Sequence, residues 1–275
     1  VKTFIALRYL IENAKEAYDL LNQSSALGIL IDYPQQDSNG LLNSIAELSA
    51  YDINKKYNSL DPVVGFIGAG NYASGTLIPA FKSANAQLDI LVTSGGVSAV
   101  HFGNKLGFRL AATDLNELWD NENINAIAIA TRHNLHAEQV ILAIKSGKNV
   151  FVEKPLALTL EDLNAVNSAF FDANNNRTNA LRLMVGFNRR FAPHITKMKS
   201  LLESKREPKI VVITINAGEI ISDHWTQDVE VGGGRIVGEG CHFIDLMQFL
   251  VGHKIINHHA IMIGGSPELD INDDK

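Results

Sequence analysis

The feature that most narrows the fold is the regular alternation of strand-like and helix-like segments that begins at Val63. The strand-like runs are short and several are apolar throughout, and the helix-like segments between them are joined to them by short links. This pattern is typical of a parallel sheet that is covered by helices on both faces. We therefore expect a doubly wound α/β sheet. Its strands are expected at residues 63–68, 88–94, 108–112, 124–131 and 149–153.

The pattern changes after Pro155, where strands and helices alternate less regularly. Longer strands are expected there, and they favour an α+β domain whose sheet is mostly antiparallel. The expected strands cover residues 181–187, 209–217 and 256–263, and the expected helices cover residues 160–173, 192–204 and 238–251.

The first 61 residues do not show the regular strand–helix alternation that begins at Val63. Residues 3–9, 12–23 and 27–33 suit a strand, an amphipathic helix and a second strand. Residues 34–61 are mostly polar, so we expect a linker that contains one weak helix around residues 41–50.

Composition excludes several classes of partner. The chain has 275 residues, a formal net charge of −6 and no basic stripe, so a nucleic-acid partner is not expected. No apolar run reaches membrane-spanning length, and the start has no basic n-region followed by an apolar h-region, so a secretion signal is not expected. The single cysteine, Cys241, allows no internal disulfide framework and fits the reducing cytoplasm. His253, His258 and His259 lack the ligand spacing of a zinc site, so no metal is expected.

A glycine turn closes the first strand of the alternating region. Gly68, Gly70 and Ala73 form a G-x-G-x-x-A pattern, with Asn71 and Tyr72 between them, and a helix is expected to follow. In such a turn the first glycine permits the tight bend, and the second lets a pyrophosphate approach the backbone. The pattern predicts a dinucleotide site for NAD(P). The alternative is a tight turn that binds no nucleotide.

The end of the second expected strand bears on the choice between NAD and NADP. NAD sites usually carry an acidic residue there, but this strand ends in Thr93-Ser94 and two glycines, and Asp89 lies at its other end. Hydroxyl groups and free glycine amides can accept a 2′-phosphate, although no arginine stands beside them. NADP is therefore slightly favoured over NAD.

A lysine stands at the same sheet edge. The strand 149–153 ends in Glu153-Lys154-Pro155, and the strand before it ends in Thr131-Arg132-His133. Ligands of open α/β sheets bind beyond the carboxyl ends of the strands. Lys154 is therefore a candidate donor to a substrate oxygen or a member of a proton relay. The alternative is an ion pair between Lys154 and Glu153 at a domain junction.

These motifs resemble the glucose–fructose oxidoreductase/inositol dehydrogenase family from about Val63 to the end. The segments that carry the resemblance are GFIGAGNYA, ATRHNLHAEQVILAIKSGKNVFVEKP, LMVGFNRRFAP and GEGCHFID. The resemblance implies a first domain that binds NAD(P), and a second, mostly antiparallel sheet that carries substrate and oligomer contacts. It also implies that the lysine of E-K-P contacts substrate and cofactor, and that a histidine of the second domain accepts the substrate proton.

Carried onto this sequence, the resemblance makes Lys154 and His242 the catalytic pair. Many family members have an aspartate four residues before the histidine, where this chain has Gly238. Either Glu239 substitutes for it, or the site works without that carboxylate, or the chemistry differs. The alternative for His242 is a structural role in its helix, and Asp245 either orients it or lies on a polar face. The expected substrate-binding residues are Lys154, Arg190, Glu239 and His242. The expected cofactor-binding residues are Gly68, Gly70, Asn71, Tyr72, Ala73, Thr93, Ser94, Thr131, Arg132, His133, His136, Glu153 and Lys154.

Residues 1–33 resemble the carboxyl end of a medium-chain alcohol-dehydrogenase-like protein. The resemblance implies a two-module oxidoreductase of sugar metabolism, of which this chain is a fragment. The expected domains are a remnant of the upstream module (1–33), a linker (34–61), a dinucleotide-binding domain (62–155) and a substrate and oligomerisation domain that is incomplete at its carboxyl end (156–275).

The sequence thus predicts an NAD(P)-dependent oxidoreductase that acts on a secondary hydroxyl or keto carbon of a sugar, nucleotide-sugar or cyclitol. Two alternatives stay open. One is a nucleotide-binding regulatory module without turnover, and the other is an NAD(P)H-dependent imine or enone reductase that needs only Lys154 as proton donor.

Overall fold

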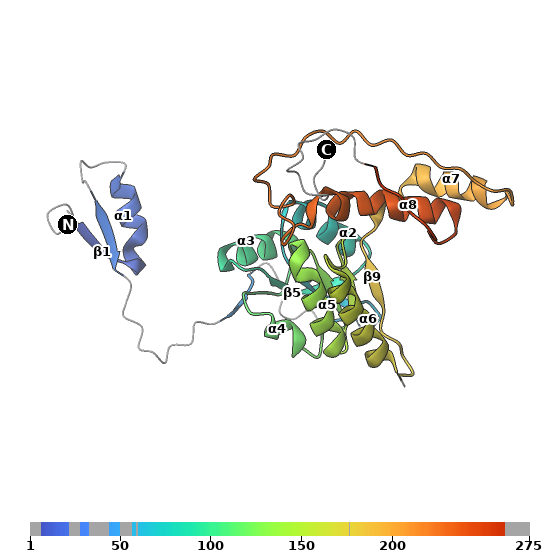
Figure 1. Cartoon of the computed structure of the whole chain (residues 1–275). Helices are drawn as coiled ribbons and strands as arrows, with labels where there is room; N and C mark the ends of the chain where they lie inside the picture. Colours follow the sequence, from blue (N-terminus) through green and yellow to red (C-terminus); the bar gives the residue numbers. More distant parts are fainter. Residues whose placement is uncertain are drawn as a thin grey trace. The chain divides into compact units, whose positions relative to one another are not determined.

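The computed structural model describes residues 7–21, 28–32, 44–49, 57–58, 60–175 and 177–261 (Figure 1). The chain divides into two compact units, Val1–Asn43 and Ser44–Lys275. The last expected strand, 256–263, and the expected incomplete end of the second domain fall partly outside the described residues.

The first unit contains a strand–helix–strand element. β1 (Leu7–Leu10) leads through η2 (Ile11–Asn13) into α1 (Ala14–Leu21), and β2 (Ile29–Asp32) follows. The two strands are parallel, with Leu7 opposite Ile29, and α1 forms the crossover connection that parallel strands need. Arg8 Nη1 lies 3.1 Å from Asp32 Oδ1, and both side chains are exposed, so this ion pair adds little stability. The elements expected over residues 3–33 are confirmed where the structure describes them.

The second unit is built on a seven-stranded sheet with the order β3-β6-β5-β4-β7-β8-β9. All neighbouring strands are parallel except β3, which runs antiparallel to β6. The parallel part of the sheet begins at β4. The next strands, β5 and β6, are added on one side of β4, and β7, β8 and β9 are then added on its other side, so the strand order reverses beside β4. This is the doubly wound order that the sequence predicts. The strands are β3 (Ile45–Glu47), β4 (Val63–Ile67), β5 (Gln87–Val92), β6 (Leu110–Ala112), β7 (Ala126–Ile129), β8 (Asn149–Val152) and β9 (Leu183–Val185).

Helices cover both faces of this sheet, because side chains of a strand alternate between its two faces. In β4, Val63 and Ile67 pack in one apolar core with α5 and α6, whereas Val64 and Phe66 pack in another with η3, α2 and α3. The expected two-faced cover is therefore confirmed (Figure 1). The helices of this part are η3 (Ala73–Leu77), α2 (Ile78–Ser83), α3 (Gly96–Leu106), α4 (Asn116–Trp119), η4 (His133–Leu135), α5 (His136–Lys145) and α6 (Leu160–Asn174).

The segment before β4 corrects the expected linker. The weak helix expected around residues 41–50 is wrong, since residues 45–47 form β3 and pair with β6. Leu48 is buried, and a Cβ on Gly103 of α3 would lie 2.4 Å from its Cδ1. The polar composition of residues 34–61 concealed this edge strand, because the partner that stabilises it lies more than sixty residues away in sequence.

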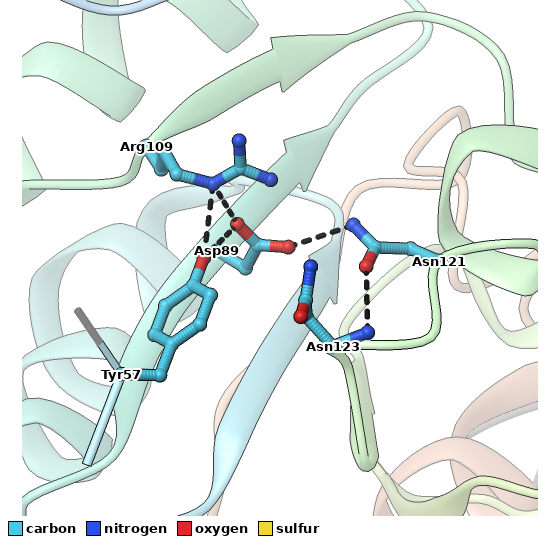
Figure 2. A network of polar contacts seen from close by, with 5 residues as sticks. All are labelled: Tyr57, Asp89, Arg109, Asn121 and Asn123. Carbon is cyan, nitrogen blue, oxygen red and sulfur yellow. Dashed lines mark hydrogen bonds and ion pairs between the residues drawn. The ribbon is translucent and has the colours of Figure 1, made fainter. Parts of the chain in front are cut away.

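Tyr57 also belongs to the second unit, through a polar network that Figure 2 shows. The fully buried carboxylate of Asp89, on β5, accepts hydrogen bonds from Tyr57 Oη, Arg109 Nε and, at 2.8 Å, Asn121 Nδ2. Arg109 Nε also donates to Tyr57 Oη at 2.9 Å. A buried charge is tolerated when it is paired and hydrogen-bonded in this way. Part of the expected linker therefore stabilises the sheet.

The boundary expected at residue 155 also needs correction. β9 lies beside β8 in parallel register, with Val150 opposite Leu183, so the first sheet continues past Pro155. Residues 177–261 then contribute η5 (Asn188–Phe191), α7 (Pro193–Glu203), η6 (Ile236–Gly240) and α8 (Cys241–Val251). Residues 209–217 and 256–261, both expected as strands, form no ladder in the described part of the chain. A strand needs a hydrogen-bonding neighbour, and the described segments supply none to them. None of the described helices is long and apolar enough to span a bilayer.

Candidate functional site

A cleft of about 1260 Å³ opens at the carboxyl ends of β4, β5, β7 and β8. This is the edge at which the sequence places the site, and the carboxyl ends of parallel strands meet there. The expected residues that line the cleft are Gly68, Gly70, Asn71, Tyr72, Ala73, Thr93, Ser94, Thr131, Arg132, His133, His136, Glu153, Lys154 and His242.

Glycine is suited to positions 68 and 70 of the turn after β4 for two different structural reasons. Gly68 has a φ of +95°, and a Cβ there would lie 2.5 Å from the carbonyl oxygen of Ala130. A side chain at this position would therefore strain the backbone and collide with the end of β7. Gly70 has no atom within 4 Å of its ideal Cβ position, and it lines the cleft. The open surface at Gly70 fits a group that approaches the backbone closely, as a pyrophosphate does.

The helix after the turn packs closely on the sheet. It begins at Asn71 and continues through η3 into α2. Ala73 is buried against the core that contains Phe66, which agrees with the small residue that the motif requires there. Asn71, Tyr72 and Ala73 line the cleft, so an anion bound there would lie at the amino end of this helix, which suits negative charge.

The loop after β5 holds its hydroxyl groups in a local network. Thr93 Oγ1 donates to the carbonyl of Gly95 at 2.7 Å and lies 2.9 Å from Ser98 Oγ. Ser94 and Ser98 line the cleft beside it. The acidic residues that line the cleft are Glu138 and Glu153, and neither follows β5. The cleft wall at the end of β5 is therefore formed by hydroxyl and backbone groups.

The two histidines that follow β7, at the starts of η4 and α5, are buried and neutral. His136 Nδ1 lies 2.7 Å from the carbonyl of Pro155 and its Nε2 lies 3.2 Å from that of Thr131, so it joins the ends of β7 and β8. His133 Nδ1 lies 2.8 Å from the carbonyl of Gly232. Burial lowers the pKa of both rings, to about 4 for His133. Both imidazoles are therefore uncharged near neutral pH.

Lys154 is joined to a distant segment and not to its neighbour Glu153. Its ammonium Nζ donates to the carbonyl of Gly238 at 2.6 Å. Glu153 Oε1 is buried and has no hydrogen-bond partner among the described residues. Burial raises the pKa of Glu153, against the smaller opposing effect of Lys154. The Lys154–Glu153 ion pair considered from the sequence does not form here, and the ammonium stays at the cleft wall.

His242 reaches the cleft from the first turn of α8. Its side chain is 8% exposed, and its Nδ1 is buried without a partner among the described residues. Burial, followed by the charges of Lys154 and Arg189, lowers the pKa of His242 to about 4. The ring is therefore a neutral imidazole near Lys154, with a lone pair that can accept a proton.

Two residues expected at the substrate do not line the cleft. Arg190 Nε donates to Asp245 Oδ2 at 2.6 Å, and a second bond joins its Nη2 to Oδ1. Glu239 Oε2, in η6, lies 3.3 Å from Nε of Arg235, the residue that precedes η6. Both expected substrate residues therefore make ion pairs outside the cleft. The structure also shows that the Asp245 carboxylate accepts its hydrogen bonds from Arg190 and does not hydrogen-bond His242.

Gln139, Asn188 and Trp225 also line the cleft. Gln139 Oε1 accepts a hydrogen bond from Thr131 Oγ1 at 2.8 Å. Asn188 Nδ2 donates to Tyr72 Oη at 3.1 Å. Trp225 lines the cleft with its ring centroid 4.8 Å from that of His133. Trp225 lies in a long irregular segment, so no periodicity in the sequence could have placed it. No group of three metal-ligating side chains occurs in the part of the chain that the structure describes.

Comparisons with known proteins agree with this geometry. Residues 63–181 match the model of an oxidoreductase family with an NAD-binding Rossmann fold. An oxidoreductase of Formosa agariphila is 30% identical over 193 residues, which are 66% of this chain and 58% of that protein. The myo-inositol 2-dehydrogenase of Thermotoga maritima is 30% identical over 151 residues, which are 55% of this chain and 43% of that protein.

A solved structure is also similar. The levoglucosan dehydrogenase in complex with NADH and levoglucosan has a TM-score of 0.59 and 25% identity, over 70% of this chain and 54% of that chain. The chain spans about half the length of the curated relatives that it matches. Residues 63–181 thus match the oxidoreductase family with an NAD-binding Rossmann fold, and this match agrees with the resemblance of the motifs to the glucose–fructose oxidoreductase/inositol dehydrogenase family.

Proposed function

We propose that this chain is the catalytic part of an NAD(P)-dependent oxidoreductase that acts on a secondary hydroxyl or keto carbon of a sugar-like substrate. The observation that carries the proposal is the composition of one cleft. The glycine turn, the ammonium of Lys154 and the neutral imidazole of His242 all line it. A dinucleotide surface is thus combined with one proton donor and one proton acceptor.

The residues present fit the cofactor. Gly70 leaves the backbone open, and the helix that begins at Asn71 offers its first amides to a pyrophosphate. Thr131, Arg132 and His133 form the adjoining wall at the end of β7. When bound, a nicotinamide cofactor supplies the hydride chemistry, and the protein supplies binding, orientation and electrostatics.

In this proposal Lys154 is the hydrogen-bond donor to the substrate oxygen, and His242 is the proton acceptor. The Lys154 ammonium donates a hydrogen bond to the substrate oxygen and stabilises negative charge that develops on it. His242 accepts the proton of the substrate hydroxyl during oxidation, since its pKa of about 4 keeps the ring neutral at ordinary pH. Because a base of such low pKa is weak, Lys154 has to lower the pKa of the bound hydroxyl for the transfer to proceed.

Sugar-like substrates are favoured by the relatives. Proteins named as a myo-inositol 2-dehydrogenase and a levoglucosan dehydrogenase are similar to this chain, and both names denote polyhydroxylated rings. Arg190, which could have bound a substrate carboxylate, is already paired with Asp245. An uncharged cyclitol or sugar therefore suits the site better than an acidic one.

The cofactor preference is the finer part of the proposal. The absence of an acidic residue after β5 in this sequence slightly favours NADPH over NADH. A similar protein, the levoglucosan dehydrogenase, has been solved in complex with NADH, the cofactor without the 2′-phosphate. Parallel titrations with NADH and NADPH measure the preference directly.

The test of the activity is a substrate screen with matched variants. Wild-type protein is incubated with NAD or NADP and a panel of cyclitols and sugars, and reduced cofactor is followed by absorbance. Lys154→Ala and His242→Ala should abolish turnover, while Lys145→Ala and His101→Ala, at exposed helix positions, should retain it. Equal turnover in all four variants would overturn the proposal.

One observation favours a second candidate, an imine or enone reductase. No carboxylate in the described part of the chain hydrogen-bonds His242, although an orienting partner is usual for a catalytic histidine. A reductase of this kind needs only a proton donor, which Lys154 can be. It predicts that Lys154→Ala is inactive and His242→Ala is active with NADPH and an imine.

A further inference from the structure

Two hydrogen bonds tie the strand ends of the sheet to one segment that leads into α8. His133, after β7, lies 2.8 Å through its Nδ1 from the carbonyl of Gly232, and Lys154, after β8, donates to the carbonyl of Gly238 at 2.6 Å. A carbonyl oxygen can only accept, so Nδ1 of His133 carries the hydrogen and donates it. The backbone amide of Asn134 adds a third bond, to the carbonyl of Val231 at 3.1 Å.

The ring of His133 also packs against this segment. Its side chain is 7% exposed, and its centroid lies 4.8 Å from that of Trp225. A Cβ on Gly238 would lie 3.2 Å from His133 Cε1 and 3.2 Å from the carbonyl oxygen of Gly232. These distances are shorter than ordinary van der Waals contacts. The His133 imidazole and the Gly232 carbonyl therefore leave little room for a side chain at position 238.

The segment carries both partners of the proposed chemistry. Gly238 supplies the acceptor for the Lys154 ammonium, and His242 follows four residues later, about one helical turn along the chain. Any shift of residues 232–238 therefore moves the Lys154 acceptor and the His242 imidazole together. Burial keeps His133 neutral, with a pKa of about 4, so its ring adds no positive charge beside Lys154.

We propose that His133 is a positioning residue, which fixes the Gly232–Gly238 segment and thereby sets the Lys154 ammonium and the His242 imidazole at their working separation. The inference rests on the proposed function, and it assigns to His133 a role different from the cofactor contact expected from the sequence. His133 acts on the reaction through Gly232 and Gly238 and does not itself contact the reacting atoms.

The test compares His133→Ala with His133→Asn, because the asparagine amide can still donate to the Gly232 carbonyl. His101→Ala, at an exposed position in α3, is the control. His133→Ala should lower kcat about 10–100-fold, the loss typical of a reacting group displaced by about 1 Å. The Kd for reduced cofactor should stay within about twofold, and His133→Asn should recover most of kcat.

A second readout does not depend on turnover. The rate at which Lys154 is acylated by an amine reagent, followed by peptide mass spectrometry, reports how firmly its ammonium is held on Gly238. His133→Ala should raise that rate, and so should Gly238→Ala, whose methyl group would press on His133 and on the Gly232 carbonyl. His133→Asn and His101→Ala should match the wild type.

Failure of the inference and failure of the proposed function give different results. If no substrate is turned over but acylation of Lys154 responds as expected, the proposed function fails and the positioning role stands. If His133→Ala and His133→Asn both raise the cofactor Kd and leave Lys154 acylation unchanged, His133 is a direct cofactor contact and the inference is overturned. Unchanged kcat in His133→Ala also overturns it. If His133→Ala does not fold, the Gly238→Ala acylation rate decides.

Discussion

The ammonium of Lys154 donates to the carbonyl of Gly238 at 2.6 Å, and this bond connects residues 84 positions apart. It joins the carboxyl end of β8 to η6, which leads directly into α8 and His242. The sequence places Lys154 at the edge of the sheet where ligands bind, and the bond shows which other element reaches that edge. The acceptor is a neutral carbonyl, so the positive charge of Lys154 remains available to a substrate oxygen.

Replacement of Lys154 should separate catalysis from cofactor binding. Lys154→Ala removes the donor to the substrate oxygen, and we expect kcat to fall about 10²–10⁴-fold, the usual range for a lost acid–base group. The Kd for reduced cofactor, measured by fluorescence, should change by less than about tenfold, since the pyrophosphate surface is the glycine turn. Loss of cofactor binding with retained kcat at saturation would contradict the assigned role.

The two glycines of the turn should respond oppositely to alanine. Gly70→Ala has no neighbour within 4 Å of the new methyl group, so the free energy of unfolding should be nearly unchanged while cofactor Kd rises about tenfold or more. Gly68→Ala would place its methyl group 2.5 Å from the Ala130 carbonyl at a φ of +95°, and should destabilise the fold by about 1–3 kcal/mol. Urea unfolding and cofactor titration of the two variants test this contrast. It fails if Gly70→Ala unfolds the protein or if Gly68→Ala is as stable as the wild type.

The buried network around Asp89 should make a large contribution to stability (Figure 2). Asp89→Ala leaves Arg109 without its buried partner, and breaking such a pair costs about 3–5 kcal/mol. Tyr57→Phe removes one hydrogen bond to a charged group and should cost about 1–3 kcal/mol. Asp172→Ala, at an exposed position in α6, is the matched control and should change stability by less than about 0.5 kcal/mol. Similar urea midpoints for all three variants would show that the network is dispensable.

Stability should fall between about pH 6.5 and pH 4. His133 and His242 have a pKa of about 4 in the folded protein against an ordinary value of 6.5, so the unfolded chain binds more protons in this window. The free energy of unfolding therefore decreases as pH falls, by up to about 1.4 kcal/mol per pH unit for each ring, and neither ring contributes a slope above the window. Urea unfolding at a series of pH values measures this slope. His242→Gln should flatten it, and an equal slope in that variant would exclude His242 as a source.

Much of the seven-stranded sheet can be predicted from local patterns in the sequence. Apolar runs such as Val63–Ile67 and the glycine turn after them are recognisable because strand burial and tight turns impose local requirements. The edge strand β3 and the network of Tyr57 were not predictable in this way. Both depend on partners far away in sequence, the open edge of β6 and the buried carboxylate of Asp89.

The candidate site also combines features that local sequence patterns predict with features that depend on distant contacts. Lys154, His133 and the glycine turn were located because they follow strands, and strand ends meet at one edge. The pairing of Arg190 with Asp245 and the position of Trp225 were not accessible, since they depend on how residues 188–251 pack. Sequence patterns specify which residues leave a sheet edge, but they do not specify which distant side chains meet them.

The central claim is that the cleft at the glycine turn binds a nicotinamide dinucleotide, and a fluorescence titration tests it most directly. Trp225 lines the cleft, so its emission should transfer to bound NADH or NADPH. The account predicts saturable transfer that is weakened in Gly70→Ala and largely lost in Trp225→Phe. Absence of saturable binding of either cofactor, in a chain shown to be folded by its cooperative unfolding, would contradict the account.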